Sequence, residues 1–445
     1  MRLMLIISLA TYFSFFMDEE VKAQNTWTLE QCIEYAISHN MDIKQSMNEK
    51  KILQIERNSL KNNFLPCLYG ESSQKYGFGR SLNRDNVYDD TNINSTMFSL
   101  SIEVPIFDGF KTAASLAKNK YSLLAQESNI QFIENDISLR VTSNYFQILL
   151  NKEICRIAQE QIVLTEEQEK KTTFLIENGK SPKSDLFDIR AQLANDKLVA
   201  TEAKNTLRLS YLDLLQIMEL RDFEQFDVEA IEETLNLLDT MKIESTYYTA
   251  LDCMPQIKYA YFSAESSKQS IKIAKSGYYP MVYLGGGINS GYYHQSGTTN
   301  ESFNYQMRNN IQNSLYITVS IPLFDRFSTR NKIKTAKVEH NKAVLTYENE
   351  KMKLYKEIEQ AHLDAISAFE KYKMTSDAVK ANQEAHRYAQ EKYASGKSSI
   401  YEYNEIKMKL GDALSQQSQA KYTYLLKCKI LDFYSFFTLL GKPLN

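Results

Sequence analysis

Residues 97–110 have the sequence MFSLSIEVPIFDGF, in which apolar and mostly polar residues alternate. From Phe98 to Ile106 every second residue is apolar, which is the two-residue period of a strand with one apolar face. The stretch ends in Asp108 and Gly109, and a long helical pattern follows. It therefore predicts a strand with one apolar face that leads directly into a helix.

The same pattern occurs a second time at residues 315–327, LYITVSIPLFDRF. The segment VPIFD at 104–108 is matched by IPLFD at 321–325, so position 104 corresponds to position 321. The alternation keeps its phase in the second copy and continues through Leu323. The chain is therefore internally duplicated, and we expect one architecture made of two similar halves.

Composition argues against several classes of function. The 445 residues carry a net charge of −3, so no overall positive field attracts nucleic acid. The cysteines lack C-x-x-C spacing and the histidines lack H-x-x-x-H spacing, and no nucleophile elbow or Walker loop occurs. We expect neither an enzyme nor a cofactor or metal site, and we interpret the cysteines as small hydrophobic residues: Cys32, Cys67, Cys155, Cys253 and Cys428.

The N-terminus predicts export. Arg2 precedes an apolar stretch from Leu3 to Met17, and Val21-Lys22-Ala23 resembles a cleavage site, so residues 1–23 are interpreted as a signal peptide. No other window approaches 18 consecutive apolar residues. If the mature chain spans a membrane, it does so with strands.

Each half is predicted to contain a helix, a β-hairpin and a long helical hairpin. The helices without proline or internal glycine are long: residues 109–178 would span roughly 105 Å at 1.5 Å per residue. Each ends at Gly-Lys, and glycine is the preferred residue directly after a helix. The predicted boundaries are 24–220 for the first repeat (helix 28–61, β-hairpin 65–107, helical hairpin 109–220 with its tip near 179–182), 221–244 for an inter-repeat segment, and 245–445 for the second repeat (helix 245–277, β-hairpin 280–324, helical hairpin 326–440 with its tip near 396–399).

Four strands with one apolar face cannot close a membrane barrel, and an open sheet edge cannot face lipid. We therefore expect three chains to contribute four strands each to a 12-stranded barrel, a number within the known range. The long helices, each with one apolar stripe, must likewise pack against one another in a second tube. Tyrosine and phenylalanine at the strand ends indicate either ordinary β-propensity or an interfacial aromatic girdle.

The duplicated strand ends, the segment Asn144-Tyr145-Phe146-x-Ile148-Leu149 and the two G-K-S turns resemble the TolC family of outer-membrane efflux proteins. The resemblance covers almost the whole mature chain. It implies an α+β membrane protein of Gram-negative bacteria that forms a trimer, with a β-barrel in outer-membrane lipid and an α-barrel that extends through the periplasm. Such a channel-tunnel is the passive exit duct of a tripartite efflux or type I secretion system.

In this family the helical tips face a periplasmic adaptor or an inner-membrane pump. The resemblance therefore assigns docking to the tip residues Gly179, Lys180, Ser181, Gly396, Lys397 and Ser398.

Acidic residues after the second turn of the family can constrict the periplasmic entrance. Glu402 and Glu405 match that acidic pair, and Asp185 and Asp188 lie at the same displacement in the first half. Spacing of i, i+3 places each pair on one helix face, and three copies would form a ring with cation preference. A purely structural explanation stands beside it, because Ser399-x-x-Glu402 is a capping box and acidic residues favour the first turn of a helix.

Two other classes of protein have long helical hairpins. A periplasmic adaptor normally has one hairpin per chain, flanked by small β domains. A secreted coiled-coil structural protein would account for the helices but not for the phase-matched strands.

Overall fold

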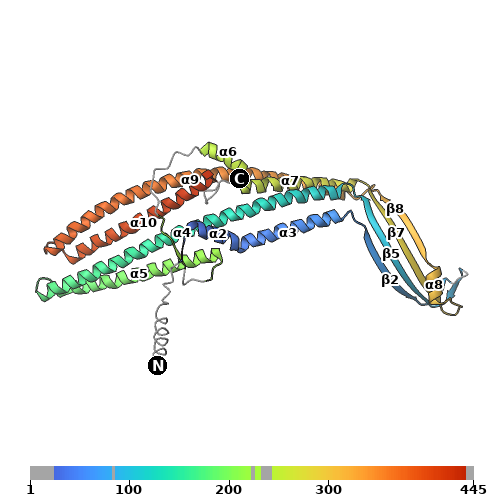
Figure 1. Ribbon diagram of the computed structural model, residues 1–445, viewed down its shortest axis with the longest axis horizontal. Helices are drawn as coiled ribbons and strands as arrows, with labels where there is room; N and C mark the ends of the chain where they lie inside the picture. The colour runs from blue at the N-terminus through green and yellow to red at the C-terminus, as the bar shows by residue number, and fades with distance from the viewer. Residues whose placement is uncertain (1–24, 83–85, 222–225, 232–242, 437–445) are drawn as a thin grey trace, which may run out of the picture. The chain divides into compact units, whose positions relative to one another are not determined.

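The computed structural model describes residues 25–82, 86–221, 226–231 and 243–436. The predicted signal peptide, much of the inter-repeat segment and the last residues of the second helical hairpin lie outside these ranges. The elements, labelled in Figure 1, are β1 (Asn25–Trp27), α2 (Leu29–His39), α3 (Met41–Asn62), β2 (Cys67–Gly77), β3 (Arg80–Leu82), β4 (Tyr88–Asp90), β5 (Ile93–Phe107), α4 (Lys111–Glu177), α5 (Lys183–Met218), β6 (Phe226–Val228), α6 (Ile243–Cys253), α7 (Pro255–Lys275), the 3-10 turn η1 (Ser276–Tyr278), β7 (Met281–Gln295), α8 (Phe303–Asn309), β8 (Gln312–Ser320), α9 (Ser328–Ala394) and α10 (Ile400–Phe436).

The chain forms two compact units that both draw on the two sequence halves. Unit 1 comprises Met1–Lys44, Ile133–Ala250 and Tyr355–Asn445, and unit 2 comprises Gln45–Phe132 and Leu251–Leu354. Each unit thus pairs a segment of the first half with its counterpart from the second. Among the described helices, none is both long enough and apolar enough to cross a membrane.

Unit 2 contains an antiparallel sheet with strand order β2-β5-β7-β8 (Figure 1). Residues that pair across neighbouring strands point to the same face of the sheet, so the register shows which side chains share a face. Leu100 pairs with Ile288, and Gly286 pairs with Leu315. The alternation predicted from both sequence copies is confirmed, and these apolar side chains share one face: Phe98, Leu100, Ile102, Ile288, Leu315, Ile317 and Val319. All of them are exposed in the single chain.

The second copy of the strand is shorter than predicted. β8 ends at Ser320, which pairs with Met281 at the start of β7, so β8 has no partner beyond this point. Ile321 and Leu323 therefore lie outside the strand. In the first copy the strand continues past Pro105, with a register shift between Pro105 and Phe107. A bulge allows a strand to accommodate proline, which has no N–H to donate.

Residues 79–95 and 290–310 are rich in polar residues and glycine, a composition typical of loops, yet they contain regular structure. β5 already begins at Ile93 and β7 runs on to Gln295, while the connections hold the short β3–β4 hairpin and helix α8. Composition marks these segments as exposed, but the backbone N–H and C=O groups still need partners, which regular elements supply.

Three consecutive glycines occupy positions 285–287 in β7, where a glycine run indicates close packing of the backbone. A Cβ on Gly285 would lie 2.3 Å from the ring of Tyr316, its neighbour across the β7–β8 pair. The tyrosine ring therefore covers the glycine on the more polar face of the sheet. This is a packing role and not a phosphate cradle.

The repeated F-D-x-F sequence caps the two longest helices. Oδ2 of Asp108 accepts a 2.7 Å hydrogen bond from the N–H of Thr112, and Asp325 accepts the equivalent 2.7 Å bond from Thr329. Phe110 and Phe327 have positive φ angles of 65° and 62°. That backbone turn lets Phe110 pack edge-on against Phe107 and lets Phe327 pack edge-on against Phe324. The duplicated sequence is therefore a duplicated strand-to-helix junction.

Unit 1 contains most of the two helical hairpins, α4–α5 and α9–α10 (Figure 1). Helices α4 and α9 both have 67 residues, which corresponds to roughly 100 Å each. The predicted long helices are confirmed, and each end lies close to its expected position. Their first residues, Lys111 and Ser328, are equivalent positions of the two sequence copies.

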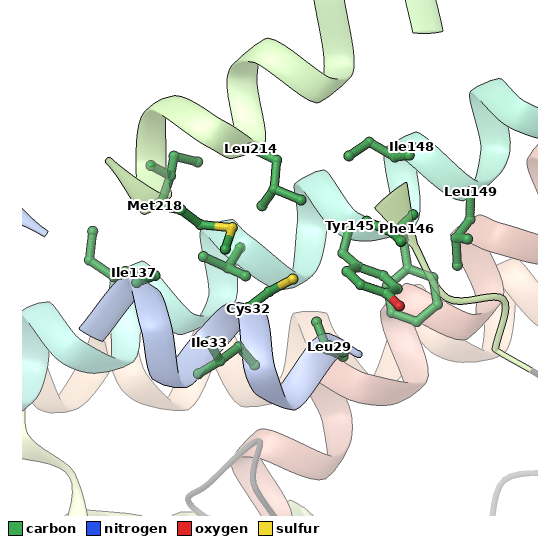
Figure 2. Close-up of a cluster of buried hydrophobic side chains, with 14 of the residues drawn as sticks. Leu29, Cys32, Ile33, Ile137, Tyr145, Phe146, Ile148, Leu149, Leu214 and Met218 are labelled. Atoms are coloured by element: carbon green, nitrogen blue, oxygen red, sulfur yellow. The ribbon is translucent and has the colours of Figure 1, made fainter. Parts of the chain in front are cut away.

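A buried cluster joins α2, α4 and α5 of unit 1. The side chains labelled in Figure 2 point toward one another: Leu29, Cys32, Ile33, Ile137, Tyr145, Phe146, Ile148, Leu149, Leu214 and Met218. Tyr145 is fully buried, and its hydroxyl lies 2.7 Å from the carbonyl oxygen of Glu229 and 3.0 Å from that of Trp27. It thereby ties α4 to the parallel β1–β6 pair. The Asn-Tyr-Phe segment of the sequence is thus part of the core.

The cysteines are free thiols, and they differ in burial. Cys32 is fully buried in the cluster, and burial raises the pKa of its thiol to about 12. It fits the interpretation as a small hydrophobic residue. Cys67 does not fit, because it is exposed at the start of β2.

The predicted helices 28–61 and 245–277 are each wrong in one respect, because each is broken once. The first breaks at Asn40, whose side-chain oxygen accepts from the N–H of Asp42 (2.9 Å) and starts a new helix. The second breaks at Met254, which has an extended backbone before Pro255. The two breaks occupy equivalent positions of the two halves. The residue period of a helix does not reveal such an interruption.

Candidate functional site

The two turns at the ends of the helical hairpins have the same geometry. In the first, the N–H of Gly179 donates to Ile176 and the N–H of Lys180 donates to Leu175. In the second, Gly396 and Lys397 donate to the equivalent carbonyls of Tyr393 and Lys392. This pair of bonds is a Schellman motif, which requires a left-handed residue, and the two glycines have φ angles of 67° and 71°.

Both turns are open to solvent. A Cβ on either glycine would meet nothing within 4 Å, and Lys180 and Lys397 are exposed. Ser181 and Ser398 are half-buried because each points its hydroxyl at the acidic residue four positions later.

In each predicted acidic pair, the carboxylate of the first residue accepts a hydrogen bond from a serine hydroxyl of the turn. Ser181 donates to Asp185 at 2.6 Å, and Ser398 donates to Glu402 at 2.7 Å. The N–H of Glu402 also donates to the hydroxyl of Ser399 at 3.2 Å. The capping explanation thus has a physical basis in the second half, where Ser399 caps α10, whereas no side-chain hydrogen bond of the described residues caps the start of α5.

The second acidic residue in each pair is exposed. Glu405 forms a 2.7 Å ion pair with Lys409, one turn further along α10, in which both side chains remain solvated. Asp188 is exposed on α5. Within this single chain, no hydrogen bond or ion pair of the described residues joins Asp185 or Asp188 to Glu402 or Glu405.

Behind the acidic residues, an apolar cluster packs the two hairpins together. Four buried side chains form this cluster: Ile189 of α5, Ala389 of α9, and Ile400 and Tyr403 of α10. Burial raises the pKa of the Tyr403 phenol. The first two turns of α10, which carry Glu402 and Glu405, are therefore anchored to both hairpins.

One turn below this cluster lies a buried ion pair that sequence reasoning missed. Nζ of Lys407 lies 3.0 Å from Oδ2 of Asp196, and the two side chains are 4% and 9% exposed. The same ammonium group donates to the carbonyl of Gln161 and to the hydroxyl of Thr165, which also bonds Asp196. The network therefore joins α4, α5 and α10.

Helical spacing contains the signal that would have revealed this pair. Ile189, Asp196 and Ala203 follow one another at intervals of seven and are all buried, so the aspartate occupies an apolar stripe. Lys407 follows Ile400 at the same interval on α10. A charge of each sign on two facing apolar stripes predicts a buried pair, provided that the two helices are known to face each other.

His386 lies beside the same network. The centre of its ring is 5.5 Å from that of Tyr403, and its buried Nε2 has no hydrogen-bond partner among the described residues. Burial, with a smaller contribution from the positive charge of Lys407, lowers the pKa of His386.

The chemistry that this region can perform is limited. Among the residues that the structure describes, no group of three or more histidine, cysteine, aspartate or glutamate side chains is arranged to hold a metal ion. The geometry instead presents exposed carboxylates on rigid helices, anchored from behind. Such carboxylates can set the local charge at an opening through which solutes pass.

Comparison with known proteins identifies the family. The model of the outer membrane efflux protein family matches residues 34–218 and again residues 246–431. The chain belongs to the outer membrane efflux protein family. Its function is that of an efflux channel, and its location is the outer membrane. This family is a class of transport channels and not of enzymes.

Individual relatives of this efflux protein are distant in sequence but similar in fold. The outer membrane protein TolC of Salmonella enteritidis is 21% identical over 413 residues, which cover 89% of this chain and 79% of TolC. The CusC channel has a TM-score of 0.77 at 14% identity, with 93% of this chain and 92% of CusC covered. The open state of the Neisseria gonorrhoeae MtrE outer membrane channel has a TM-score of 0.72 at 15% identity, with 94% and 89% covered.

Proposed function

We propose that three copies of this chain assemble into the exit duct of a tripartite efflux or type I secretion system. The observation that carries the proposal is the sheet of unit 2. Among the residues that the structure describes, its outer strands β2 and β8 are each paired on one side only, and the sheet exposes an apolar face. Neither feature suits a single chain in water, whereas three sheets joined edge to edge form a closed 12-stranded barrel with its apolar face toward lipid.

The same reasoning applies to the helices. Many large apolar side chains of the long helices remain exposed in the single chain, among them Val338, Leu345 and Met352 of α9. Packing against helices of neighbouring copies would cover such side chains and would form a tube in the periplasm.

The turns at Gly179-Lys180-Ser181 and Gly396-Lys397-Ser398 are the proposed docking points for a periplasmic adaptor and an inner-membrane pump. Their support is their exposure and their rigid, repeated Schellman geometry. Energy for transport would come from the pump, so the duct itself needs no catalysis and no cofactor.

We assign the entrance constriction to Glu402 and Glu405, with Asp185 and Asp188 contributing from the first half. In a trimer each position occurs three times, and a ring of carboxylates attracts cations. The local bonds and a constriction are compatible, because the serine hydroxyls hold the carboxylates of Asp185 and Glu402 in position without neutralising them.

The other two classes of protein are less well supported. Neither a periplasmic adaptor nor a secreted coiled-coil protein would explain why the sheet exposes an apolar face. Neither class accounts for the family match over both halves of the chain.

Single-channel conductance in planar bilayers tests the proposal. The double variant Glu402→Gln/Glu405→Gln removes six carboxylates from the proposed ring, so we expect higher conductance and weaker block by multivalent cations. A matched control is Lys409→Gln, which breaks the same surface ion pair but keeps the carboxylates. This control should strengthen cation block, because it leaves Glu405 uncompensated.

Unchanged conductance and block in the double variant would leave Glu402 and Glu405 with a capping role alone. A protein that remains monomeric in mild detergent and forms no channels would refute the trimeric duct itself.

A further inference from the structure

Helix α8 and the residues around it cover an edge of the sheet that no strand covers. β8 pairs with β7 only as far as Asn289, so no strand of the described part of the chain pairs with residues 290–295 of β7 on that side. Side-chain amides replace the missing strand. The amide of Asn310 donates to the carbonyl of Gly291 at 2.7 Å. The side-chain amide of Gln306 accepts from the N–H of Tyr293 and donates to its carbonyl, at 2.9 Å each. The side-chain amide of Asn300 accepts from the N–H of Gln295 at 2.9 Å and donates to its carbonyl at 2.8 Å.

These bonds make the segment a fixed part of the sheet. They satisfy five backbone groups at three successive outward-facing positions of β7, which lowers the cost of removing this edge from water. Gln306, which is buried, provides two of the five bonds.

The segment lies on the apolar face of the sheet. The hydroxyl of Ser290 donates to the carbonyl of Met307 at 2.7 Å, and Ser290 pairs with Phe98, which belongs to the apolar stripe. Tyr292, two residues further along on the same face, has its ring 5.3 Å from that of Phe303. α8 is therefore on the side that the proposed function turns toward lipid.

The position of α8 along the strands coincides with the end of the apolar stripe. From Phe98 to Ile106 the stripe has nine residues, about the length that a tilted strand needs to cross a membrane. Beyond Phe98 the same face carries Thr96 and Asn94, opposite Tyr292 and His294. The aromatic side chains of Tyr292 and Phe303 thus lie at the boundary between the apolar and polar parts, where membrane proteins place interfacial aromatic residues.

A depression of about 570 Å³ lies beside α8 on this face. Its wall includes Met307 and Ile311 on one side, and its floor includes Phe98, Leu100 and Ile288. Ile311, Phe303 and Tyr305 are exposed, with 55%, 45% and 56% of their surfaces accessible. The result is an apolar hollow that opens onto the surface of the sheet, with aromatic side chains on the adjacent helix.

We propose that this hollow binds an acyl chain of an outer-leaflet lipid, while Phe303 and Tyr305 of α8 lie at the headgroup boundary. The inference rests on the proposed orientation of the sheet in the outer membrane and adds a defined lipid site to it. The lipid is favoured over a second copy of the chain because the hollow is on the face of the sheet. Copies that join edge to edge meet at β2 and β8 and leave that face open.

Fluorescence quenching by brominated phosphatidylcholine tests the proposal in liposomes that contain the full chain. Trp27 is the single native tryptophan, and its signal can be subtracted as a constant background. Tryptophan is introduced separately at Phe303, at Ile311 and at two control positions. Ile317→Trp reports the apolar face of β8, and Lys75→Trp reports the opposite face of β2.

We expect Phe303→Trp and Ile311→Trp to be quenched about as strongly as Ile317→Trp and several-fold more strongly than Lys75→Trp. Bromine placed near the headgroup should quench position 303 most, and bromine deeper in the chain should quench position 311 more. Each variant must retain the oligomeric state and channel activity of the native protein.

Quenching at position 317 without quenching at 303 and 311 would overturn the lipid site. In that case blue-shifted emission from 303 and 311 would show that protein, such as a second copy, covers them, and red-shifted emission would show that water does. Absence of quenching at 317 as well would instead refute the proposed membrane orientation of the sheet.

Discussion

Replacing Lys407 with methionine removes one partner of the buried ion pair and leaves the Asp196 carboxylate buried without its cation. Breaking a buried pair in this way typically costs about 3–5 kcal/mol. Here Asp196 keeps hydrogen bonds from Thr165 and from Gln192, the latter at 2.7 Å, so we expect the lower end, about 3 kcal/mol. The double variant Lys407→Met/Asp196→Leu replaces both charges by apolar groups. The double variant should recover most of the lost free energy of unfolding, because a protein with a well-packed apolar pair is often as stable as one with the buried ion pair.

Native-state hydrogen exchange tests this prediction, because it measures the stability of each helix separately. A loss of about 3 kcal/mol corresponds to roughly a hundredfold faster exchange of the amides around position 407 in α10 and around position 196 in α5. Lys409→Met is the matched control on the same helix. Its ion pair with Glu405 is solvated, so its effect should stay below about 1 kcal/mol.

The reasoning would be refuted if Lys407→Met left exchange in both helices unchanged. It would also be refuted if the double variant were at least as unstable as the sum of the two single variants, because the charges would then act independently.

Three further perturbations should change the thermal midpoint, two of them with opposite signs and the third in a pH-dependent way. Gly109 has a φ of 69°, and a Cβ there would lie 2.8 Å from the carbonyl of Ser276, so Gly109→Ala should lower the thermal midpoint. Arg326→Gly at the equivalent position, where φ is 56°, should raise it by removing left-handed strain of about 1 kcal/mol; shifts of the same sign would contradict this. Folding lowers the pKa of His386, so the unfolded chain takes up a proton at this residue at a higher pH than the folded protein does. The contribution of His386 to the stability of the folded protein is therefore complete above the ordinary histidine pKa of about 6.5, and it is lost as the pH falls below that value. The thermal midpoint should therefore drop on acidification in the native protein and drop less in His386→Gln, and equal slopes would rule out this residue as the source.

Much of the fold could be predicted because its signals are local. Two-residue alternation at 97–107 and at 315–320 specifies strands with one apolar face, and the absence of proline and glycine throughout α4 and α9 specifies the two longest helices. The Gly-Lys turns were also found correctly, since a helix end with a left-handed residue favours glycine over all others. The duplication doubled each of these signals and fixed which segments correspond.

The candidate site was predictable only in part. The assignment of Asp185, Asp188, Glu402 and Glu405 to the entrance comes from the family resemblance and the duplication, and it stays a prediction. The serine bonds that hold two of these residues lie within the same local sequence. The Lys407–Asp196 pair was not found. Its members are far apart in the sequence, and nothing in either local sequence states that α5 and α10 face each other.

The sequence by itself determined which segments are helices and strands, how the halves correspond and where the chain turns, because each depends on residues within a few positions of one another. Tertiary structure alone decided the strand order β2-β5-β7-β8, the seating of α8 on the apolar face and the meeting of Lys407 with Asp196. Those features depend on which surfaces come together in three dimensions, and residue periodicity gives the face of an element but not its partner.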